Sequence, residues 1–550
     1  MAELIFTGGP IVTVDAGMRR VEALAVADGR IRALGAHDEV MRHRGPETYV
    51  VDLAGRALLP GFVEAHGHPT LMAMALAPPA VDVRPFTVPT GADVLEAIRR
   101  EAAAAEPDTP LCFYGIDVLL QPGLTPPTRA ELDELAPRNP VVVVANSGHA
   151  AYANTAMLDA AGVTRDTPDP PGASFVRDAD GAPTGEGRES GAVALLMAPS
   201  TRAGGTRFPV NMRWAYGELA RAGYTTVTDM AYGGNLHDRL ALLADDPDCK
   251  VRLRAYEIGT PPLVRAPGHV MGEAPGAGPL FAQIGMKLWA DGSPWQGNIA
   301  TSFPYLDTDA TRRLGLEAGH RGGLNHGPEE LAELAVAFTR QGYQLACHVH
   351  GDVAVDAVLD AYEQALAKEE DAPEPPVDAR PRLEHCGAMT REQFARAADL
   401  GATVSLFPEH LYYWGDVLAD DLFGEEVAGR WMAARSALDA GLRVSFHNDG
   451  TVTPPDPLGN IASAVTRTTR DGRVLGESER ITVAEALRAQ TIDAAWQLHL
   501  DEEIGSLAVG KHADLVVLDR DPLETSPESL REIGVVATYL GGRQTHGTPL

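Results

Sequence analysis

Eight short apolar runs of strand type occupy the middle of the 550-residue chain, and they constrain its fold more than any other feature. The runs lie at residues 58–68, 223–230, 251–258, 284–292, 343–352, 380–386, 401–408 and 442–449. Helical patterns such as PEELAELAVAFTRQ and TREQFARAADL separate several of them. Strands that alternate with helices build parallel sheets. Eight such runs therefore predict an α/β protein with a (β/α)8 TIM barrel.

The two ends of the chain differ from this middle part. Residues 1–57 and 496–550 consist of short strand-like segments with turn residues between them. Neither end is long enough to bury a sheet face alone, so we expect both to form one small β-sandwich-like domain beside a barrel of residues 58–495.

The gap between the first two runs is too long for one helix. Residues 75–205, approximately, are therefore expected to be an insertion after barrel strand 1, over the barrel mouth.

Charge and cysteine content exclude several classes of function. The formal net charge is -30 and the sequence pI is about 4.9, which disfavours nucleic acid and anionic membrane surfaces as partners. The four cysteines lie far apart and suggest neither a disulfide framework nor a cysteine zinc site. The sequence shows no signal-peptide pattern and no apolar stretch of membrane-span length. We expect a cytoplasmic protein that acts on a small molecule, with a homodimer left open.

The stretch LLPGFVEAHGHPT ends the first apolar run in two histidines, His66 and His68. On an extended strand, residues i and i+2 point to the same side, so both imidazoles would face one point. An isolated H-x-H is more often a surface or loop pair than a metal site. Its position after a buried-type strand favours the metal site, because parallel-sheet enzymes place their chemistry at strand ends.

The other predicted strands carry chemically competent side chains at corresponding positions. In a barrel, the carboxyl ends of all strands meet at one mouth, so residues far apart in sequence become neighbours there. Strand 1 contributes His66 and His68. The remaining candidates are Lys287 in strand 4, His348 in strand 5, His385 in strand 6 and Asp449 in strand 8.

These residues lie in motifs that resemble the amidohydrolase superfamily, and within it the amidohydrolase-3 branch that includes N-substituted formamide deformylases. The motifs are PGFVEAHGH, GHAAYANTAML, GAPTGEGRE, GYTTVTDM, MKLWADGS, HVHGD, RLEHC, HNDGTVTPPDPL, ALRAQTIDAAWQL and IGSLAVGKHADLVVLD. They cover nearly the whole chain. Two departures, Asn448 in HND and Gly187 in GEGRE, remove no metal ligand and bear on substrate identity alone.

The resemblance implies one or two divalent metal ions, Zn²⁺ first among them. It assigns His66 and His68 to the more buried ion and His348 and His385 to the other. Asp449 would both bind metal and carry the proton from the attacking water to the leaving amine, as a catalytic residue.

Lys287 is an unusual member of this set, because a protonated ammonium has no lone pair for a metal. The resemblance implies that Lys287 is carboxylated and that its carbamate oxygens bridge two ions. The alternative is a lysine that extends its ammonium to water or pairs with Asp291.

A second group of residues is expected to bind substrate. His149 in NSGHAAYANT resembles a family histidine near the pocket, the alternative being an ordinary loop histidine. His410, Tyr413 and Trp414 follow the seventh strand and offer flat apolar area for an aryl or alkyl substituent, unless they only pack the interior. His350 shares a strand face with His348 and is interpreted as a supporting or structural histidine.

The strand-end residues and the family resemblance together predict a metal-dependent hydrolase of a C–N bond in a linear amide, and the resemblance implies N-substituted formamides as the preferred subclass. One alternative is a deaminase or cyclic-amide hydrolase on the same barrel, with a single metal ion. The other is a non-catalytic scaffold relative, which the retention of every expected ligand disfavours.

Overall fold

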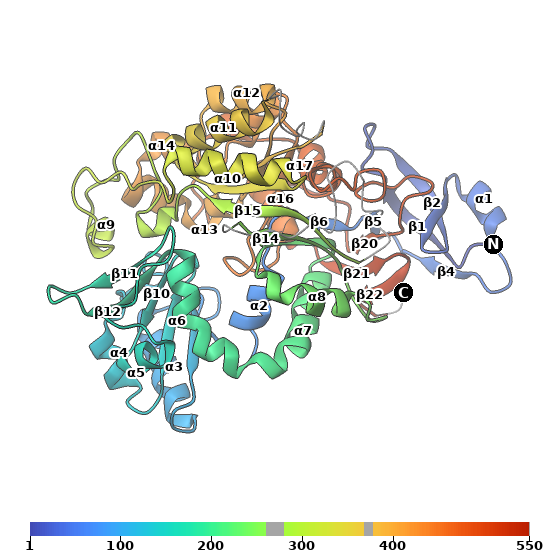
Figure 1. The fold of residues 1–550 in the computed structure, drawn as a ribbon. Helices are drawn as coiled ribbons and strands as arrows, with labels where there is room; N and C mark the ends of the chain where they lie inside the picture. The colour runs from blue at the N-terminus through green and yellow to red at the C-terminus, as the bar shows by residue number, and fades with distance from the viewer. Residues whose placement is uncertain (260–279, 368–377, 549–550) are drawn as a thin grey trace.

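A parallel eight-stranded sheet forms the centre of the computed structural model, which describes residues 1–259, 280–367 and 378–548 (Figure 1). Each strand pairs with the next barrel strand along the chain, in the order β19-β18-β17-β16-β15-β14-β13-β6. The strands are β6 (Phe62–Glu64), β13 (Tyr224–Tyr232), β14 (Arg252–Ile258), β15 (Phe281–Trp289), β16 (Gln344–Val349), β17 (Arg382–His385), β18 (Thr403–Leu406) and β19 (Val444–Phe446). Each of the eight predicted runs overlaps one of these strands. The prediction of a (β/α)8 barrel is confirmed.

The ring closes between β6 and β19 through the segments that follow these strands. The backbone N–H of His68 donates to the carbonyl of Gly450 at 3.0 Å. The backbone N–H of Asn448 donates to the carboxylate of Glu64, also at 3.0 Å. Closure therefore occurs at the carboxyl end of the barrel, next to the H-x-H pair.

Helices cover the outside of the sheet, and two of them match helical patterns in the sequence. α10 (Pro328–Arg340) has proline in its first turn, where a missing N–H costs nothing, and buries an apolar face against the barrel. α12 (Arg391–Asp399) starts with a capping box from Thr390 and Gln393. The other helices of this part are α7 (Phe208–Arg221), α8 (His237–Ala244), α9 (Asp309–Arg313), α11 (Asp352–Leu366), α13 (Glu409–Val417), α14 (Glu425–Gly429), α15 (Ala434–Asp439), α16 (Pro457–Thr466), α17 (Val483–Ala489) and α18 (Ile492–Gln497).

Both ends of the chain contribute to a second sheet, as expected. Its order is β22-β21-β20-β5-β1-β2-β3, and β4 also pairs with β1. N-terminal and C-terminal strands meet where β5 pairs antiparallel with β20, and the two termini lie on the same side of the molecule (Figure 1). The strands are β1 (Leu4–Val12), β2 (Arg20–Ala27), β3 (Arg30–Gly35), β4 (Tyr49–Asp52), β5 (Ala57–Pro60), β20 (Leu515–Leu518), β21 (Val535–Leu540) and β22 (Arg543–His546), with the short helix α1 (His37–Val40).

The first predicted run, residues 58–68, divides at Gly61. β5 before it belongs to the small sheet, whereas β6 after it belongs to the barrel. A Cβ atom at Gly61 would collide with the side chain of Thr225, so only glycine lets the chain pass between the two sheets here. The strand ends at Glu64, and both histidines of the H-x-H pair lie just beyond it.

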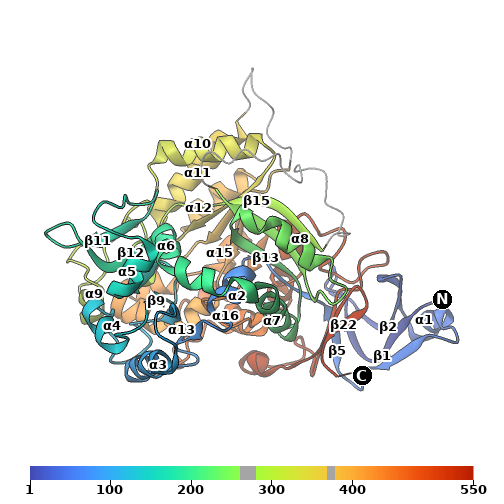
Figure 2. The same cartoon turned by 60° about the horizontal axis from the view of Figure 1, so that its bottom comes forward.

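The segment between β6 and β13 contains a third sheet, of order β11-β12-β10-β9-β8-β7, which lies beside the barrel (Figure 2). Its elements are α2 (Pro69–Ala75), β7 (Val81–Asp82), α3 (Gly91–Ala104), β8 (Leu111–Ile116), α4 (Arg129–Leu135), β9 (Val141–Ala145), β10 (Ala150–Ala153), α5 (Thr155–Ala161), β11 (Ser174–Arg177), β12 (Pro183–Arg188) and α6 (Glu189–Ala203). An insertion after barrel strand 1 is thus present, while the exact residue limits of the three parts stay predictions. Within the described ranges, no helix has the length and hydropathy of a membrane span.

Candidate metal centre

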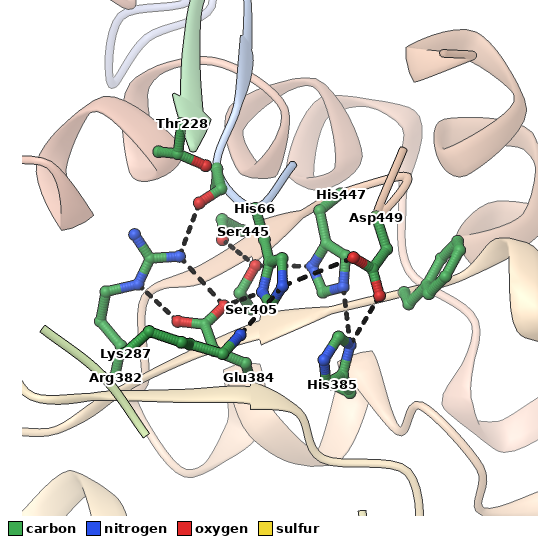
Figure 3. Close-up of polar contacts among 12 residues, drawn as sticks. His66, Thr228, Lys287, Arg382, Glu384, His385, Ser405, Ser445, His447 and Asp449 are labelled. Carbon is green, nitrogen blue, oxygen red and sulfur yellow. Dashed lines mark hydrogen bonds and ion pairs between the residues drawn. The ribbon is translucent and has the colours of Figure 1, made fainter. Parts of the chain in front are cut away.

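The six candidate metal-binding side chains gather at the carboxyl end of the barrel. They come from β15, from the ends of β16 and β17, and from the segments after β6 and β19. All six line one cavity of about 640 Å³. Figure 3 shows four of them together: His66, Lys287, His385 and Asp449.

The buried ion pair of Arg382 and Glu384 orients His66. Its Nδ1 lies 2.7 Å from Oε2 of Glu384. Arg382 donates to Oε1 of the same carboxylate at 2.7 Å and to Oε2 at 3.1 Å. A carboxylate only accepts, so Nδ1 carries the proton and Nε2 keeps its lone pair. A carboxylate behind the distal nitrogen is the usual support of a metal-binding histidine.

His68 and Asp449 complete the first group of donors. Nε2 of His68 lies 3.1 Å from Oδ1 of Asp449, and Nε2 of His66 lies 3.5 Å from the same oxygen. Burial alone would raise the pKa of Asp449, but the hydrogen bond with His68 and nearby positive charges hold that pKa well below its usual value. Asp449 therefore presents an ionised carboxylate to the cavity.

The second group is formed by His348, His350 and His385, whose donor atoms lie within 4.8 Å of one another. Nε2 of His348 donates to the carbonyl of Gly292 at 2.8 Å, which leaves the lone pair on Nδ1. Nε2 of His385 is buried without a hydrogen-bond partner in the described part of the chain. Burial lowers the pKa of all three imidazoles, so they are neutral and able to donate lone pairs.

Lys287 lies between the two groups with 1% of its surface exposed. Its Nζ is 3.1 Å from Nε2 of His66, which is its hydrogen-bond partner among the residues described. Burial lowers the pKa of Lys287 to about 8, although the carboxylates of Glu384 and Asp449 act in the opposite direction. An ammonium has three donors to satisfy, and a pKa of about 8 makes the neutral amine more accessible here than at an ordinary lysine.

The donor set fits divalent metal ions. Neutral imidazole nitrogens and a carboxylate are the ligands that zinc and similar ions prefer. A buried imidazole nitrogen without a partner costs free energy, and a cation beside Nε2 of His385 would supply that partner. His66, His68 and Asp449 would hold one ion, and His348 with His385 the other.

Backbone strain coincides with this site. His385 has φ 72°, Asp449 has φ 49° and Glu189, which contacts His149, has φ 63°. Left-handed backbone costs on the order of 1–3 kcal/mol at a non-glycine residue and clusters at functional sites. These three residues are therefore among the described non-glycine residues with left-handed backbone.

A family profile for the amidohydrolase family matches residues 49–546 of the chain. The chain belongs to the amidohydrolase family. Its predicted membership of the amidohydrolase-3 branch is confirmed, and the chain is a hydrolase that acts on carbon–nitrogen bonds.

Two curated relatives match this amidohydrolase over nearly its full length. N-substituted formamide deformylase from Arthrobacter pascens is 31% identical, with 98% of each chain covered. Protein LONG AFTER FAR-RED 3 from Arabidopsis thaliana is 29% identical, and the match covers 99% of this chain and 92% of that one. Among solved structures, an uncharacterized metal-dependent hydrolase from Pyrococcus horikoshii has a TM-score of 0.71 at 22% identity, covering 95% of this chain and 99% of that one. The fold is therefore shared.

The insertion supplies the histidine expected near the pocket of the amidohydrolase. His149 lines the cavity, and its ring centroid lies 4.9 Å from that of His348. Its Nδ1 is 2.6 Å from Oε2 of Glu189, and Asn298 donates to the other oxygen at 2.9 Å. Burial would lower the pKa of His149, but the Glu189 carboxylate raises it above its usual value.

The other three residues expected to bind substrate do not line this cavity. Trp414 is fully buried, stacks on Trp295 with ring centroids 4.9 Å apart, and donates from Nε1 to Asp117 at 2.9 Å. His410 is also buried and packs edge-on against Trp295. Tyr413 packs against Phe86. The structure places these rings in the packing behind the site, because α13 turns its aromatic face towards the interior.

Sequence reasoning missed His447. It follows β19 and lies 3.0 Å from Nδ1 of His385, and it forms a candidate metal group with His385 and His66. The signal was the i, i+2 spacing of His447 and Asp449, the same logic that singled out the H-x-H pair. His350, interpreted as a supporting residue, has donor atoms close enough to join the second group.

Replacing His66 or His385 with alanine is expected to lower the metal content of the purified amidohydrolase, because each removal takes one nitrogen donor from the proposed centre. Metal per chain is measured by elemental analysis, and circular dichroism checks the fold. His326→Ala is the matched control, since His326 pairs with Glu330 at 3.2 Å outside the cavity. Unchanged metal content in both site variants contradicts the assignment.

Proposed function

We propose that this amidohydrolase cleaves the C–N bond of a linear amide and prefers N-substituted formamides. The observation that carries the proposal is a single cavity that is lined by all six candidate ligands and also by several apolar side chains. The name of the Arthrobacter pascens relative points to the same substrate class.

The apolar lining of the cavity supports an apolar substituent on the amide nitrogen. Apolar side chains come from α2, α6, α7 and β15, namely Met74, Val193, Met197, Phe208 and Trp289. A pocket of this kind buries an apolar ligand while a few polar groups fix its orientation. We infer that the formyl carbon lies against the ligands and that an alkyl or aryl substituent fills the apolar part.

The chemistry follows from the proposed ligands. Divalent ions held there, with Zn²⁺ as our first proposal, would polarise the amide carbonyl and lower the pKa of the attacking water. Asp449 is ionised and lies beside both histidines of the H-x-H pair, so it accepts the proton of the attacking water. It then returns that proton to the leaving nitrogen, because an amine leaves poorly unless it is protonated.

His149 assists from beside His348, since the two ring centroids lie 4.9 Å apart. The Glu189 carboxylate holds its Nδ1 proton, so Nε2 is the nitrogen free to contact substrate. A histidine held in this way orients the amide by a hydrogen bond to its oxygen or nitrogen.

The four cysteines are all buried and unpaired, which agrees with our proposal of a reducing, cytoplasmic setting.

The proposed function is tested by offering formamides, acetamides and cyclic amides with the same N-substituent to zinc-loaded enzyme. We expect the highest kcat/KM on the N-substituted formamide, loss of activity on chelation, and recovery when zinc is added. Hydrolysis of the cyclic amide alone would replace this proposal with the cyclic-amide alternative. No hydrolysis of any amide by metal-loaded protein would support the scaffold alternative.

Asp449→Asn tests the proton transfer. Loss of a positioned acid–base group lowers rates by on the order of 10²–10⁴-fold, so we expect kcat to fall by that range while KM changes little. Activated anilides, whose leaving groups need no proton, should recover relatively more. Asp229→Asn is the control. It changes another buried carboxylate next to the barrel mouth, which accepts a hydrogen bond from the backbone N–H of Thr70. Near-full kcat of Asp449→Asn on an alkyl amide excludes this role.

We also propose that Lys287 is carboxylated. The neutral amine adds to carbon dioxide, forms an N–C bond and releases one proton, which leaves a carbamate with two oxygens able to bridge metal ions. Complete burial and a single hydrogen-bond partner among the described residues support this modification. It also removes a cation that would repel a metal ion beside His66.

The Lys287 proposal predicts a carbamate on Nζ in a structure of metal-loaded protein grown with bicarbonate. Lys287→Ala should lose activity and regain part of it with added short carboxylic acids, which can supply the missing oxygens. Lys287→Arg, which keeps a cation and cannot carboxylate, should not respond to them. An unmodified ammonium away from any metal ion contradicts the proposal.

A further inference from the structure

One helix of the insertion lines the cavity from its first turn to its last. α6 leads from the third sheet to α7 (Figure 1). Its cavity-lining residues include Ser190, Val193, Ala194, Met197, Thr201 and Arg202. Spacings of three and four residues define a single face of a helix. A helix rises about 1.5 Å per residue, so the cavity extends roughly 18 Å along α6.

The two ends of this helix differ in chemistry. At the start, Glu189 contacts His149, whose ring centroid lies 4.9 Å from that of His348 in the proposed metal centre. At the end, Arg202 occupies the last turn and lines the same cavity. A substrate with its amide at the metal centre would therefore approach Arg202 only through a long substituent.

A second arginine, Arg239 of α8, also lines the cavity. Its guanidinium carbon lies 4.3 Å from the ring centroid of Phe208, and one N–H donates to the carbonyl of Gly205 at 3.2 Å. Phe208 is buried at the start of α7, and Gly205 lies just beyond the end of α6. These two contacts hold Arg239 close to the end of the helix that carries Arg202.

The charge of this part of the cavity is not balanced from within. Neither arginine forms an ion pair with a carboxylate in the described ranges, and Arg239 uses one of its five N–H donors on Gly205. Among the described lining residues, Asp449 is the only carboxylate, and it belongs to the proposed metal centre. The whole chain has 76 acidic and 46 basic residues, so a pair of unmatched cations in one cavity stands out. Their free donors are available to an anion from solution.

We propose that Arg202 and Arg239 are specificity-determining residues, which bind a carboxylate at the end of the N-substituent remote from the scissile amide. The planar guanidinium matches the geometry of a carboxylate and binds it through paired hydrogen bonds. The substrate class is then an ω-formamido carboxylic acid, whose apolar spacer lies along Val193 and Met197 of α6. This inference rests on the proposed function, because the amide is taken to lie at the metal centre.

A series of ω-formamido carboxylic acids and the matching ω-formamido alcohols tests the substrate class on zinc-loaded enzyme. Hydrogen bonds to a charged group are stronger than those to a neutral one, so we expect kcat/KM for a long acid to exceed that for its alcohol by about 10-fold. The preference should vanish for formylglycine, whose carboxylate is too close to the amide to contact Arg202. No preference for the acid at any spacer length overturns the inference.

Arg202→Gln and Arg239→Gln test the two residues. Each should raise KM for the long acid by about 10-fold and thereby reduce the preference for acid over alcohol. Arg207→Gln is the matched control, because Arg207 is exposed in the turn after α6, does not line the cavity and carries the same charge. If both site variants keep the full preference, the arginines are only solvated surface groups and the inference is wrong. An equal loss in Arg207→Gln would assign the effect to net charge and would also contradict it.

Binding without turnover separates this inference from the proposed function. Isothermal titration compares phenylbutyrate with phenylbutanol on zinc-loaded protein and on the double variant Arg202→Gln/Arg239→Gln. We expect tighter binding of the acid, and loss of about 10-fold in its affinity in the double variant. That result without hydrolysis of any formamide would reject the proposed function and retain the anion site. Hydrolysis of formamides with equal affinity of the double variant for the acid would retain the function and reject the anion site.

Discussion

The ion pair between Arg382 and Glu384 is the interaction on which the centre of this barrel depends. Both side chains are fully buried. Arg382 also donates to the carbonyl of Ala65 at 2.8 Å and to the hydroxyl of Tyr256 at 3.1 Å, so one guanidinium joins β6, β14 and β17. Glu384 holds the proton of His66 in place. Breaking a buried pair typically costs about 3–5 kcal/mol, and here the same loss would release a proposed metal ligand.

The strands and their ends were predictable because both depend on local pattern. Apolar runs of strand length, separated by helical patterns, predicted the eight strands that form β6 and β13 to β19. The rule that strand ends meet at one mouth then brought His66, Lys287, His385 and Asp449 together without knowledge of any contact. The first run was the exception, because the sequence does not reveal that the chain changes sheets at Gly61.

The surroundings of the ligands were not predictable in the same way. His410, Tyr413 and Trp414 have the composition of a substrate pocket, but the rotation of α13 about its axis decides which side they face, and that depends on packing with Trp295 and Asp117. Part of the apolar lining of the cavity comes from α6 and α7, outside the motifs that marked the ligands. The contacts of His447 with His385 and Ser405 depend on the positions of individual atoms, which no residue pattern contains.

The left-handed backbone at Glu189, His385 and Asp449 limits how this enzyme can be improved. Glycine would relax the local strain at all three positions, yet glycine would also remove the side chains to which the proposed chemistry belongs. A laboratory selection for heat resistance alone would therefore favour substitutions that silence the enzyme. Variants should be screened for turnover and melting temperature together, because at these positions the two properties are opposed.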